Sequence, residues 1–407
     1  MSSMHATEDV LVIGAGPAGI ASAYALQHAN ISYKVVDRAE QIGHTWASLY
    51  PSLTLNTSRY FSHMPNKPFP QSYGIFPTGQ QYHDYLLEFV SEHHFNIHLG
   101  IEVHRVSPDG NLWRVETSEG VFLYKAVISA SGIWNNPIMP KIDGMDAFTG
   151  DLYHAHDFRD PAQVLDKRVL VVGNGPSGID ISIAAGKVAE KSYIGIRSGV
   201  TMKRRYPLGI PAHAWLLFAE RLPKAWCRRI MKWVGSFNFG DTSEYGLNPP
   251  PPDSGGMTGY AGDDLLKAVK AGEVTPVAAP IQFEGNIATL ADGQTLALDT
   301  VIMATGYEPV MQQYLDIDLH YSDEPWQAQS ICDWEIGPNG QRGWALRDTS
   351  EHPNGRQVLG HQGLYLVGTF YKGKGAMFNF NVEADIAATQ IKQYLAEFQE
   401  TMPAAAD

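Results

Sequence analysis

The sequence predicts an α/β fold with two domains of the same kind, the second inserted into the first. Two segments share one pattern: a short apolar run, then G-x-G-x-x-G, then a helix-like stretch. The apolar runs cover residues 10–13 and 169–172, and the glycine motifs cover residues 14–19 and 173–178. A strand that passes through such glycines into a helix opens a Rossmann-like dinucleotide-binding unit. One copy is weak support, but two copies in the same context predict two dinucleotide-binding domains.

The residues of both motifs suit the backbone of a bound dinucleotide. The glycines let the turn tighten, and they let backbone N–H groups approach a pyrophosphate at the N-terminus of the following helix. The motif residues that we expect to contact cofactor are Gly14, Gly16, Pro17, Ala18, Gly19, Gly173, Asn174, Gly175, Pro176, Ser177 and Gly178.

The residues that follow the two motifs differ in charge. The stretch 33–36 after the first motif ends in Asp37, whose carboxylate can accept hydrogen bonds from ribose hydroxyls. The stretch 193–196 after the second ends in Arg197, with a basic run at residues 203–205 close behind. Cations there favour the 2′-phosphate of NADP, and a solvated basic loop is the alternative. We therefore predict two dinucleotides, the second of them NADPH.

Two further apolar stretches each end in a glycine. Residues 126–131 lead into Gly132, and residues 300–305 lead into Gly306. Each is typical of a buried strand whose backbone passes close to a neighbour where it ends. We expect both to support the dinucleotide sites.

The C-terminal third is expected to complete the first domain. It holds another short strand at residues 363–368 and a helix at residues 381–394. The predicted first domain is therefore discontinuous, residues 1–160 and 295–407, and the second covers residues 161–294.

Residues 207–262 interrupt the alternation of strands and helices. Apolar side chains recur there at helical spacing with Lys and Arg between them, and Pro223 splits the stretch into two helices. Our favoured interpretation is an amphipathic pair buried against the inserted domain. A lid over a substrate channel and a membrane-surface helix are the alternatives. The proline run at residues 249–252 predicts a stiff surface loop.

The composition excludes several classes of protein. Of the 407 residues, 44% are apolar and 18% are charged, which excludes a disordered or fibrous chain. The net charge of −13 argues against a general nucleic-acid binder. The two cysteines, Cys227 and Cys332, form no C-x-x-C, which argues against a disulfide framework and a redox dithiol pair.

Targeting signals are not apparent in the sequence. The first ten residues hold no long apolar core of the kind that a signal peptide needs. No stretch reaches the ~18 uninterrupted apolar residues of a membrane span. We therefore expect a soluble, cytoplasmic protein.

The segment before the second glycine motif resembles that of a known family. Phe148, Gly150, His154 and Phe158 match the F-x-G-x-x-x-H-x-x-x-(F/Y) fingerprint of class B flavin-containing monooxygenases. Related Baeyer–Villiger enzymes usually end this fingerprint in Trp, so Phe158 favours the flavin-containing monooxygenase branch. We interpret the fingerprint as a linker that holds the second domain in register. His154 and His156 lack the Cys or acidic partner of a ligand set, so no metal is expected.

Other segments extend the resemblance over nearly the whole chain. Residues 304–307 resemble the family's A-T-G-Y motif, and residues 56–58 resemble its N-T-S segment. Residues 43–46 are similar to its G-G-x-W region, although His44 stands at the second glycine. Residues 239–247 look like the plant enzymes that oxidise indole-3-pyruvate to auxin.

The resemblance implies a reaction. NADPH on the second domain would reduce FAD on the first, and reduced flavin would capture O2 as a C4a-(hydro)peroxide. A small N- or S-containing nucleophile, or a 2-oxo acid, would then take the distal oxygen. The cofactor supplies the chemistry, and the protein supplies placement and a site that excludes water. The resemblance also implies a homodimer.

The resemblance further assigns residues to the cofactors. It places Asp37 on the adenosine ribose of FAD, Trp46 beside the flavin, and Asn56 at the flavin C4a–N5 edge as the catalytic residue. An Asx-turn and a glycosylation sequon are the alternatives for Asn56. The other cofactor-binding residues that we expect are Arg38, Gln41, Thr45, Ala130, Ser131, Gly132, Arg197, Ser198, Arg204, Ala304, Thr305, Gly306 and Tyr307.

Three other functions compete with this hypothesis. Baeyer–Villiger oxygenation of a ketone is disfavoured by Phe158, and a two-dinucleotide disulfide or quinone reductase is disfavoured by the missing C-x-x-C. A non-catalytic nucleotide sensor would keep the glycine loops without consuming oxygen. Substrate identity is not fixed by the sequence.

Overall fold

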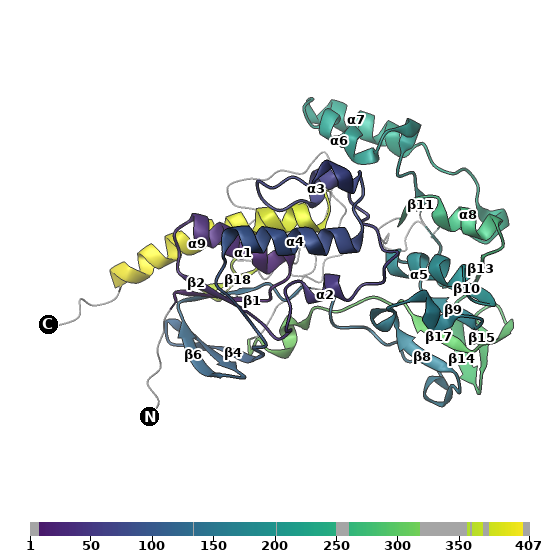
Figure 1. Ribbon diagram of the computed structural model, residues 1–407, viewed down its shortest axis with the longest axis horizontal. Coiled ribbons are helices and arrows are strands. Elements are labelled where there is room, and N and C mark those ends of the chain that lie inside the picture. The colour runs from purple at the N-terminus through teal and green to yellow at the C-terminus, as the bar shows by residue number, and fades with distance from the viewer. Residues whose placement is uncertain are drawn as a thin grey trace. The chain divides into compact units, whose positions relative to one another are not determined.

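The computed structural model describes residues 8–132, 134–200, 202–249, 260–317, 356–358, 360–368 and 374–401 (Figure 1). Through its contacts the chain divides into two compact units. The first unit comprises Met1–Ala47, Thr57–Asn135 and Pro309–Asp407, and the second comprises Ser48–Asn56 and Asn136–Glu308. Cys332 and the predicted proline loop beyond Pro249 lie outside the described residues.

A parallel five-stranded sheet forms the centre of the first unit. Its order is β18-β7-β1-β2-β3, so Val10 lies opposite Tyr33 on one side and Ala126 on the other. Since the strand order reverses at β1, the carboxyl end between β1 and β7 is where such a sheet binds ligands. The strands are β1 (Val10–Ile13), β2 (Tyr33–Asp37), β3 (Ile97–Leu99), β7 (Ala126–Ser129) and β18 (Leu364–Leu366).

Helices cover this sheet, and the first of them starts directly after β1. Gly16 is its N-cap and Pro17 its first residue, where proline's missing N–H is not needed. Its small buried residues allow close packing against the C-terminal helix α9, drawn in yellow in Figure 1. The helices are α1 (Pro17–His28), α2 (His44–Ala47), α3 (Arg59–Ser62), α4 (Gly79–His93) and α9 (Ala376–Thr401).

A small antiparallel sheet completes the first unit. Trp113 and Val115 of its middle strand join a buried cluster with Tyr314 and Leu364, which ties the small sheet to the main one. Its strands are β4 (Val103–Asp109), β5 (Leu112–Thr117) and β6 (Gly120–Tyr124).

The second unit repeats the parallel architecture. Its sheet has the order β13-β10-β9-β17-β8, and α5 leaves the end of β9 as α1 leaves β1. These elements are β8 (Asp151–His154), β9 (Arg168–Val172), β10 (Lys191–Ile196), β13 (Val274–Ala278), β17 (Thr300–Met303), α5 (Pro176–Gly186) and α8 (Asp264–Lys270). A separate antiparallel sheet holds β14 (Pro280–Glu284), β15 (Ile287–Leu290) and β16 (Thr295–Ala297).

A helical insertion leaves this unit between two short paired strands. Met202 of β11 (Met202–Lys203) pairs with Tyr260 of β12 (Tyr260–Ala261), which closes the base of the insertion. The insertion carries α6 (Ala212–Ala219) and α7 (Lys224–Gly235), which pack on each other (Figure 1). The 3-10 turns within the described residues are η1 (Gln71–Tyr73), η2 (Met145–Ala147), η3 (Ala155–Asp157), η4 (Pro161–Val164), η5 (Pro207–Gly209), η6 (Ser243–Tyr245) and η7 (Val310–Gln313).

The mixed α/β fold with an inserted second unit is confirmed, but the predicted domain bounds differ from the unit bounds. We placed residues 136–160 and 295–308 in the first domain. In the structure β8 pairs with β17, and β17 pairs with β9, so both strands belong to the second sheet. That pairing joins residues about 150 positions apart, which local pattern does not reveal. The predicted C-terminal helix at residues 381–394 is longer, Ala376–Thr401.

The favoured interpretation of the helical insertion is wrong in one respect. The sequence predicted two helices split at Pro223, and Pro223 is indeed the N-cap of α7. The pair is only partly buried, however, because Phe218, Trp226 and Trp233 are 56%, 57% and 49% exposed. Among the described residues, no helix combines the length and apolar character needed to cross a membrane.

Candidate functional site

The first glycine motif forms a tight cradle at the carboxyl end of β1. A Cβ on Gly14, whose φ is +112°, would lie 2.5 Å from the carbonyl oxygen of Ala130. A Cβ on Gly19 would lie 1.8 Å from the carbonyl oxygen of Gly14, so helix and loop touch backbone to backbone. A Cβ on Gly16 would meet no protein atom within 4 Å. Two glycines are therefore required by packing, while Gly16 borders open space at the N-terminus of α1, where an anion is stabilised.

Asp37 fastens this cradle to the end of β2. One carboxylate oxygen accepts a hydrogen bond from the N–H of Ala15 at 2.7 Å, and the other accepts one from Ala39 at 2.8 Å. Each oxygen has a second lone pair to offer, so the carboxylate can also accept from a ribose hydroxyl. The fastening role was not predicted from the sequence.

The loop after β7 closes the other side of the cradle. Gly132 has a φ of +76° and no atom near its missing Cβ, which leaves open space beside the predicted residues Ala130 and Ser131. The Tyr314 hydroxyl lies 2.6 Å from the Ser129 hydroxyl and donates to that of Ser131 at 3.0 Å. Tyr314 was not predicted, because it approaches this loop from 183 residues away.

Trp46, which is predicted to lie beside the flavin, is on α2. The indole of Trp46 lies 4.4 Å from the ring of Tyr82, centroid to centroid. Tyr82 is fully buried, and its hydroxyl has no hydrogen-bond partner among the described residues. Burial raises the pKa of Tyr82 well above its ordinary value, so the hydroxyl stays protonated. A buried donor without a partner fits a ligand that supplies an acceptor, and it was not predicted.

Other predicted residues of this unit lie at the surface. Arg38 and Gln41 are exposed, and Thr45 is half-buried on α2. The Gln41 amide lies 3.3 Å from Nδ1 of His44, the residue that departs from the family pattern. The turn at Gly43 is fixed by His83, whose Nε2 lies 3.0 Å from the carbonyl oxygen of the neighbouring residue Ile42.

Asn56 is exposed and belongs by its contacts to the second unit, whereas Thr57 belongs to the first. No hydrogen bond joins its side chain to the part of the chain that the structure describes. The Asx-turn alternative therefore has no hydrogen bond to support it.

The second glycine motif repeats the first cradle closely. A Cβ on Gly173, whose φ is +116°, would lie 2.4 Å from the carbonyl oxygen of Ala304, and one on Gly178 would lie 2.0 Å from that of Gly173. Gly175, like Gly16, has no protein atom within 4 Å of its missing Cβ. The Asn174 amide donates to the carbonyl of Gly199 at 2.5 Å, which fixes the loop after β10. Pro176 and Ser177 form the first turn of α5.

The predicted cations lie beyond the end of β10. Arg197 is exposed, and neither a hydrogen bond nor an ion pair joins it to the described residues. Ser198 follows it, half-buried. Arg204 is engaged: its Nε donates to the carbonyl of Asn238 at 3.0 Å, and its guanidinium lies 4.7 Å from the Phe239 ring centroid. Arg197 is thus exposed and not engaged by the described residues, unlike Arg204.

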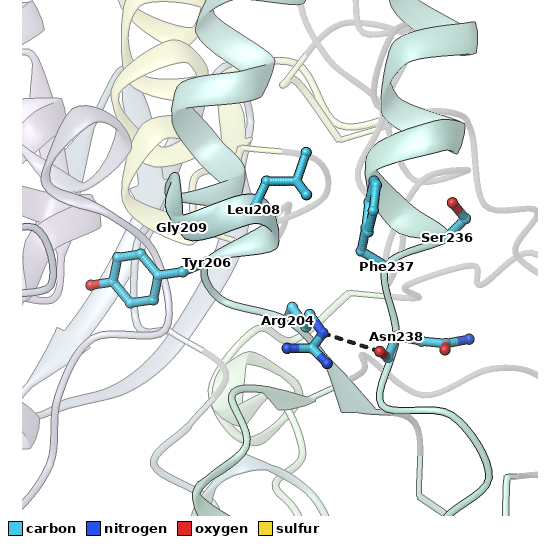
Figure 2. Close-up of a pocket in the computed structure, with 7 residues that line it drawn as sticks. All are labelled: Arg204, Tyr206, Leu208, Gly209, Ser236, Phe237 and Asn238. Atoms are coloured by element: carbon cyan, nitrogen blue, oxygen red, sulfur yellow. Dashed lines mark hydrogen bonds between the residues drawn. The ribbon is translucent and has the colours of Figure 1, made fainter.

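Arg204 also lines a pocket of roughly 470 Å³ at the base of the helical insertion. Figure 2 shows Leu208 and Phe237 on opposite sides of this pocket, with Arg204 and Asn238 below them in the view. The lining residues are Arg204, Tyr206, Leu208, Gly209, Ser236, Phe237 and Asn238.

The A-T-G-Y residues, 304–307, form the loop that follows β17 and are hydrogen-bonded to the segment around Ile138. The hydroxyl of Thr305 donates to the carbonyl of Ile138 at 2.6 Å, and the N–H of Ile138 donates to the carbonyl of Gly306 at 3.0 Å. The ring of Tyr307 packs edge-on against His154 at 5.0 Å. Burial lowers the pKa of His154, which favours a neutral imidazole.

The family fingerprint lies inside the second unit. Phe158 is fully buried and packs 5.8 Å from the ring of Tyr50, and Phe148 packs on Phe283 at 5.4 Å. A Cβ on Gly150 would lie 2.4 Å from the carbonyl oxygen of Asp299. These residues fix the edge strand β8 and its approach to β17.

Comparisons with known proteins agree with this architecture. Residues 11–204 match the family described as pyridine nucleotide-disulphide oxidoreductase. The probable indole-3-pyruvate monooxygenase YUCCA9 of Arabidopsis thaliana is 30% identical over 322 residues, which cover 75% of this chain and 76% of that protein. The chain belongs to the class B flavin-containing monooxygenase family. It is thus an enzyme of the flavin-dependent monooxygenase type.

Other relatives of this flavin monooxygenase match over more of its length. Indole-3-pyruvate monooxygenase YUCCA8 of Oryza sativa subsp. japonica is 28% identical over 416 residues, covering 98% of this chain and 93% of that protein. The flavin-containing monooxygenase from Stenotrophomonas maltophilia has the same fold, with a TM-score of 0.66 and 22% identity over 95% of this chain and 99% of that one. The bacillithiol disulfide reductase from Staphylococcus aureus also shares it, with a TM-score of 0.65 and 16% identity over 96% and 98%. Fold alone therefore does not separate oxygenation from reduction.

Proposed function

We propose that this flavin monooxygenase uses FAD, NADPH and O2 to oxygenate a small 2-oxo acid, or a small nucleophile that contains nitrogen or sulfur. The observation that carries the proposal is the pair of matching cradles that differ in charge. The first has the carboxylate of Asp37 at the end of its second strand, and the second has the exposed cation Arg197 directly after its second strand.

The residues of the first cradle fit FAD. Gly16 leaves the space beside the N-terminus of α1 that a pyrophosphate needs, and Asp37 keeps lone pairs for the ribose. Tyr82 offers a buried donor next to Trp46. We propose that the side-chain amide of Asn56, which offers both donors and an acceptor, binds at the flavin edge.

The residues of the second cradle fit NADPH. Gly175 leaves the corresponding space at α5, and Arg197 would bind the 2′-phosphate that distinguishes NADPH from NADH. When bound, FAD and NADPH would supply the two electrons of a hydride for the activation of O2; with one proton, one oxygen atom would then reach the substrate and the other would leave as water.

The relatives favour a 2-oxo acid as substrate, because the curated relatives named above are indole-3-pyruvate monooxygenases. We also propose that the protein acts in the cytoplasm as a homodimer, by analogy with the family. Equilibrium sedimentation tests the dimer.

The experiment is a substrate screen with the FAD-loaded protein. NADPH oxidation, product and peroxide are measured together with indole-3-pyruvate, other 2-oxo acids, amines, sulfides and ketones. The proposal expects oxygenated product from a 2-oxo acid, an amine or a sulfide, and increased peroxide in Asn56→Ala. Oxygenation of ketones alone would favour the Baeyer–Villiger alternative, and NADPH oxidation that yields no product with any compound would contradict the proposal.

A further inference from the structure

The helical insertion presents an apolar surface that the cradles do not explain. We call it the α6–α7 surface. It consists of side chains that are 43–57% exposed, on η5, α6 and α7. They are Tyr206, Leu208, Ile210, Phe218, Trp226 and Trp233.

The same segment is strongly basic in an acidic protein. Residues 203–235 hold eight Lys and Arg but one Glu, while the whole chain has a net charge of −13. Six of these nine charged side chains are on α7 or in the turn between α6 and α7. The rest of the chain is therefore even more acidic than the total suggests.

The two kinds of side chain are ordered along α7. Trp226, Ile230 and Trp233 recur at i, i+4 and i+7, so they share one face of the helix. Exposed Arg229 borders that face, with its guanidinium 5.6 Å from the ring centroid of Trp226. Lys232 is exposed on the neighbouring arc.

The exposed rings are held in place although they face solvent. Trp233 packs edge-on against Trp215 at 5.9 Å and against Phe237 at 5.0 Å. Leu208, which Figure 2 shows at the rim of the pocket, keeps a φ of +55° that leucine rarely adopts. Ordered aromatic and aliphatic side chains that are exposed in the isolated protein are typical of a surface that becomes buried against a binding partner.

We propose that the α6–α7 surface docks on an anionic phospholipid membrane as an interfacial element that does not span it. Basic side chains beside exposed Trp and Leu are the pattern of helices that lie in the headgroup region. A second copy of this chain is a poorer partner, because a symmetric contact would place one basic surface against another. The acidic remainder of the chain would be repelled by the membrane, which orients the docked protein.

The test is sedimentation of the full-length, FAD-loaded protein with vesicles. One set is phosphatidylcholine alone, and the other is phosphatidylcholine mixed with phosphatidylglycerol. We expect binding to the phosphatidylglycerol vesicles, weaker binding to phosphatidylcholine, and loss of binding as salt rises. Trp fluorescence should shift to the blue on binding.

Two double variants separate the apolar and the basic contributions. Trp226→Ser with Trp233→Ser should weaken binding at least about tenfold. Arg229→Gln with Lys232→Gln should weaken it about 25-fold, since each basic side chain near an anionic surface contributes roughly fivefold. The matched control is Ile281→Ser, a side chain that is 55% exposed on β14 of the same unit, and it should bind as the parent protein does. FAD content and melting temperature show that each variant is folded.

Three results would overturn the proposal. The first is no association with phosphatidylglycerol vesicles at low salt. The second is vesicle binding by both double variants that is as strong as that of the parent protein. The third is a concentration-dependent dimer that the Trp variant loses, without vesicle binding by the parent protein, because the surface would then join two copies.

Discussion

Arg356 and Glu383 form an ion pair inside the first unit, with Nη1 and Oε1 2.7 Å apart and both side chains almost fully buried. The second oxygen of Glu383 accepts the N–H of Gly368 at 2.5 Å. A Cβ on Gly368 would lie 2.8 Å from the Cβ of Ala18, in the first turn of α1. The pair therefore fixes the backbone after β18 against the helix that begins the first cradle.

Removing one partner of this pair should be strongly destabilising. Glu383→Gln removes the carboxylate beside the buried Arg356 guanidinium. Breaking a buried ion pair in this way costs about 3–5 kcal/mol in comparable cases. Urea unfolding of the FAD-loaded protein measures the change. The matched control is Asp316→Asn, which breaks the exposed ion pair with Arg105 in the same unit and should cost far less, because solvent screens exposed pairs. Equal losses in the two variants would contradict the role assigned to the buried pair.

Gly175→Ala should separate cofactor binding from packing in the second cradle. The new Cβ meets no protein atom within 4 Å, so stability should change by about 1 kcal/mol or less. It would occupy space proposed for the NADPH pyrophosphate, so the KM for NADPH should rise at least about tenfold. Gly178→Ala is the contrasting variant, because its Cβ would lie 2.0 Å from a backbone oxygen and should destabilise the unit itself. An unchanged KM in Gly175→Ala would place NADPH elsewhere.

Arg197→Ala should erode the preference for NADPH over NADH. A charge-assisted contact to phosphate is worth about 1.5–3 kcal/mol, so the ratio of kcat/KM values should fall by roughly 10- to 100-fold. The fall should come from NADPH, with NADH nearly unaffected. Lys191→Ala, an exposed cation at the opposite end of β10, is the control. If Arg197→Ala kept both efficiencies, the basic loop would be a solvated surface.

The ion pair of Arg168 with Asp299 should make stability depend on acid pH. The guanidinium donates through Nε at 2.9 Å and Nη2 at 2.7 Å, and the N–H of Arg168 adds a third hydrogen bond at 2.9 Å. These contacts lower the pKa of Asp299 to about 2. Because the carboxyl is more acidic in the folded protein, its stabilisation is present above the ordinary pKa of 3.8 and is lost as the pH falls towards 2.

Urea midpoints measured across that range for the parent protein and Asp299→Asn check this prediction. The difference between them should shrink as the pH falls from about 5 to about 2. The effect should be modest, since the carboxyl is 38% exposed. A difference that stayed constant over the range would mean that the pair does not titrate as described.

The local parts of the fold were predictable, and the long-range parts were not. Each cradle is one continuous strand, loop and helix, so a glycine motif within about twenty consecutive residues predicts it. The pairing of β8 with β17 and the approach of Tyr314 to Ser131 join distant segments, so neither was predicted. Helical spacing identified α7 but did not reveal that Trp226 is 57% exposed, because the amphipathic period is the same for a buried and an exposed face.

The most direct test of the central claim is rapid mixing of the NADPH-reduced protein with oxygenated buffer, followed by absorbance. We expect an absorbing species that is neither reduced nor oxidised flavin, that lasts longer with NADP⁺, and that decays faster when a substrate is added. Direct return to oxidised flavin with stoichiometric peroxide, with NADP⁺ and every candidate substrate present, would contradict the assignment as a monooxygenase.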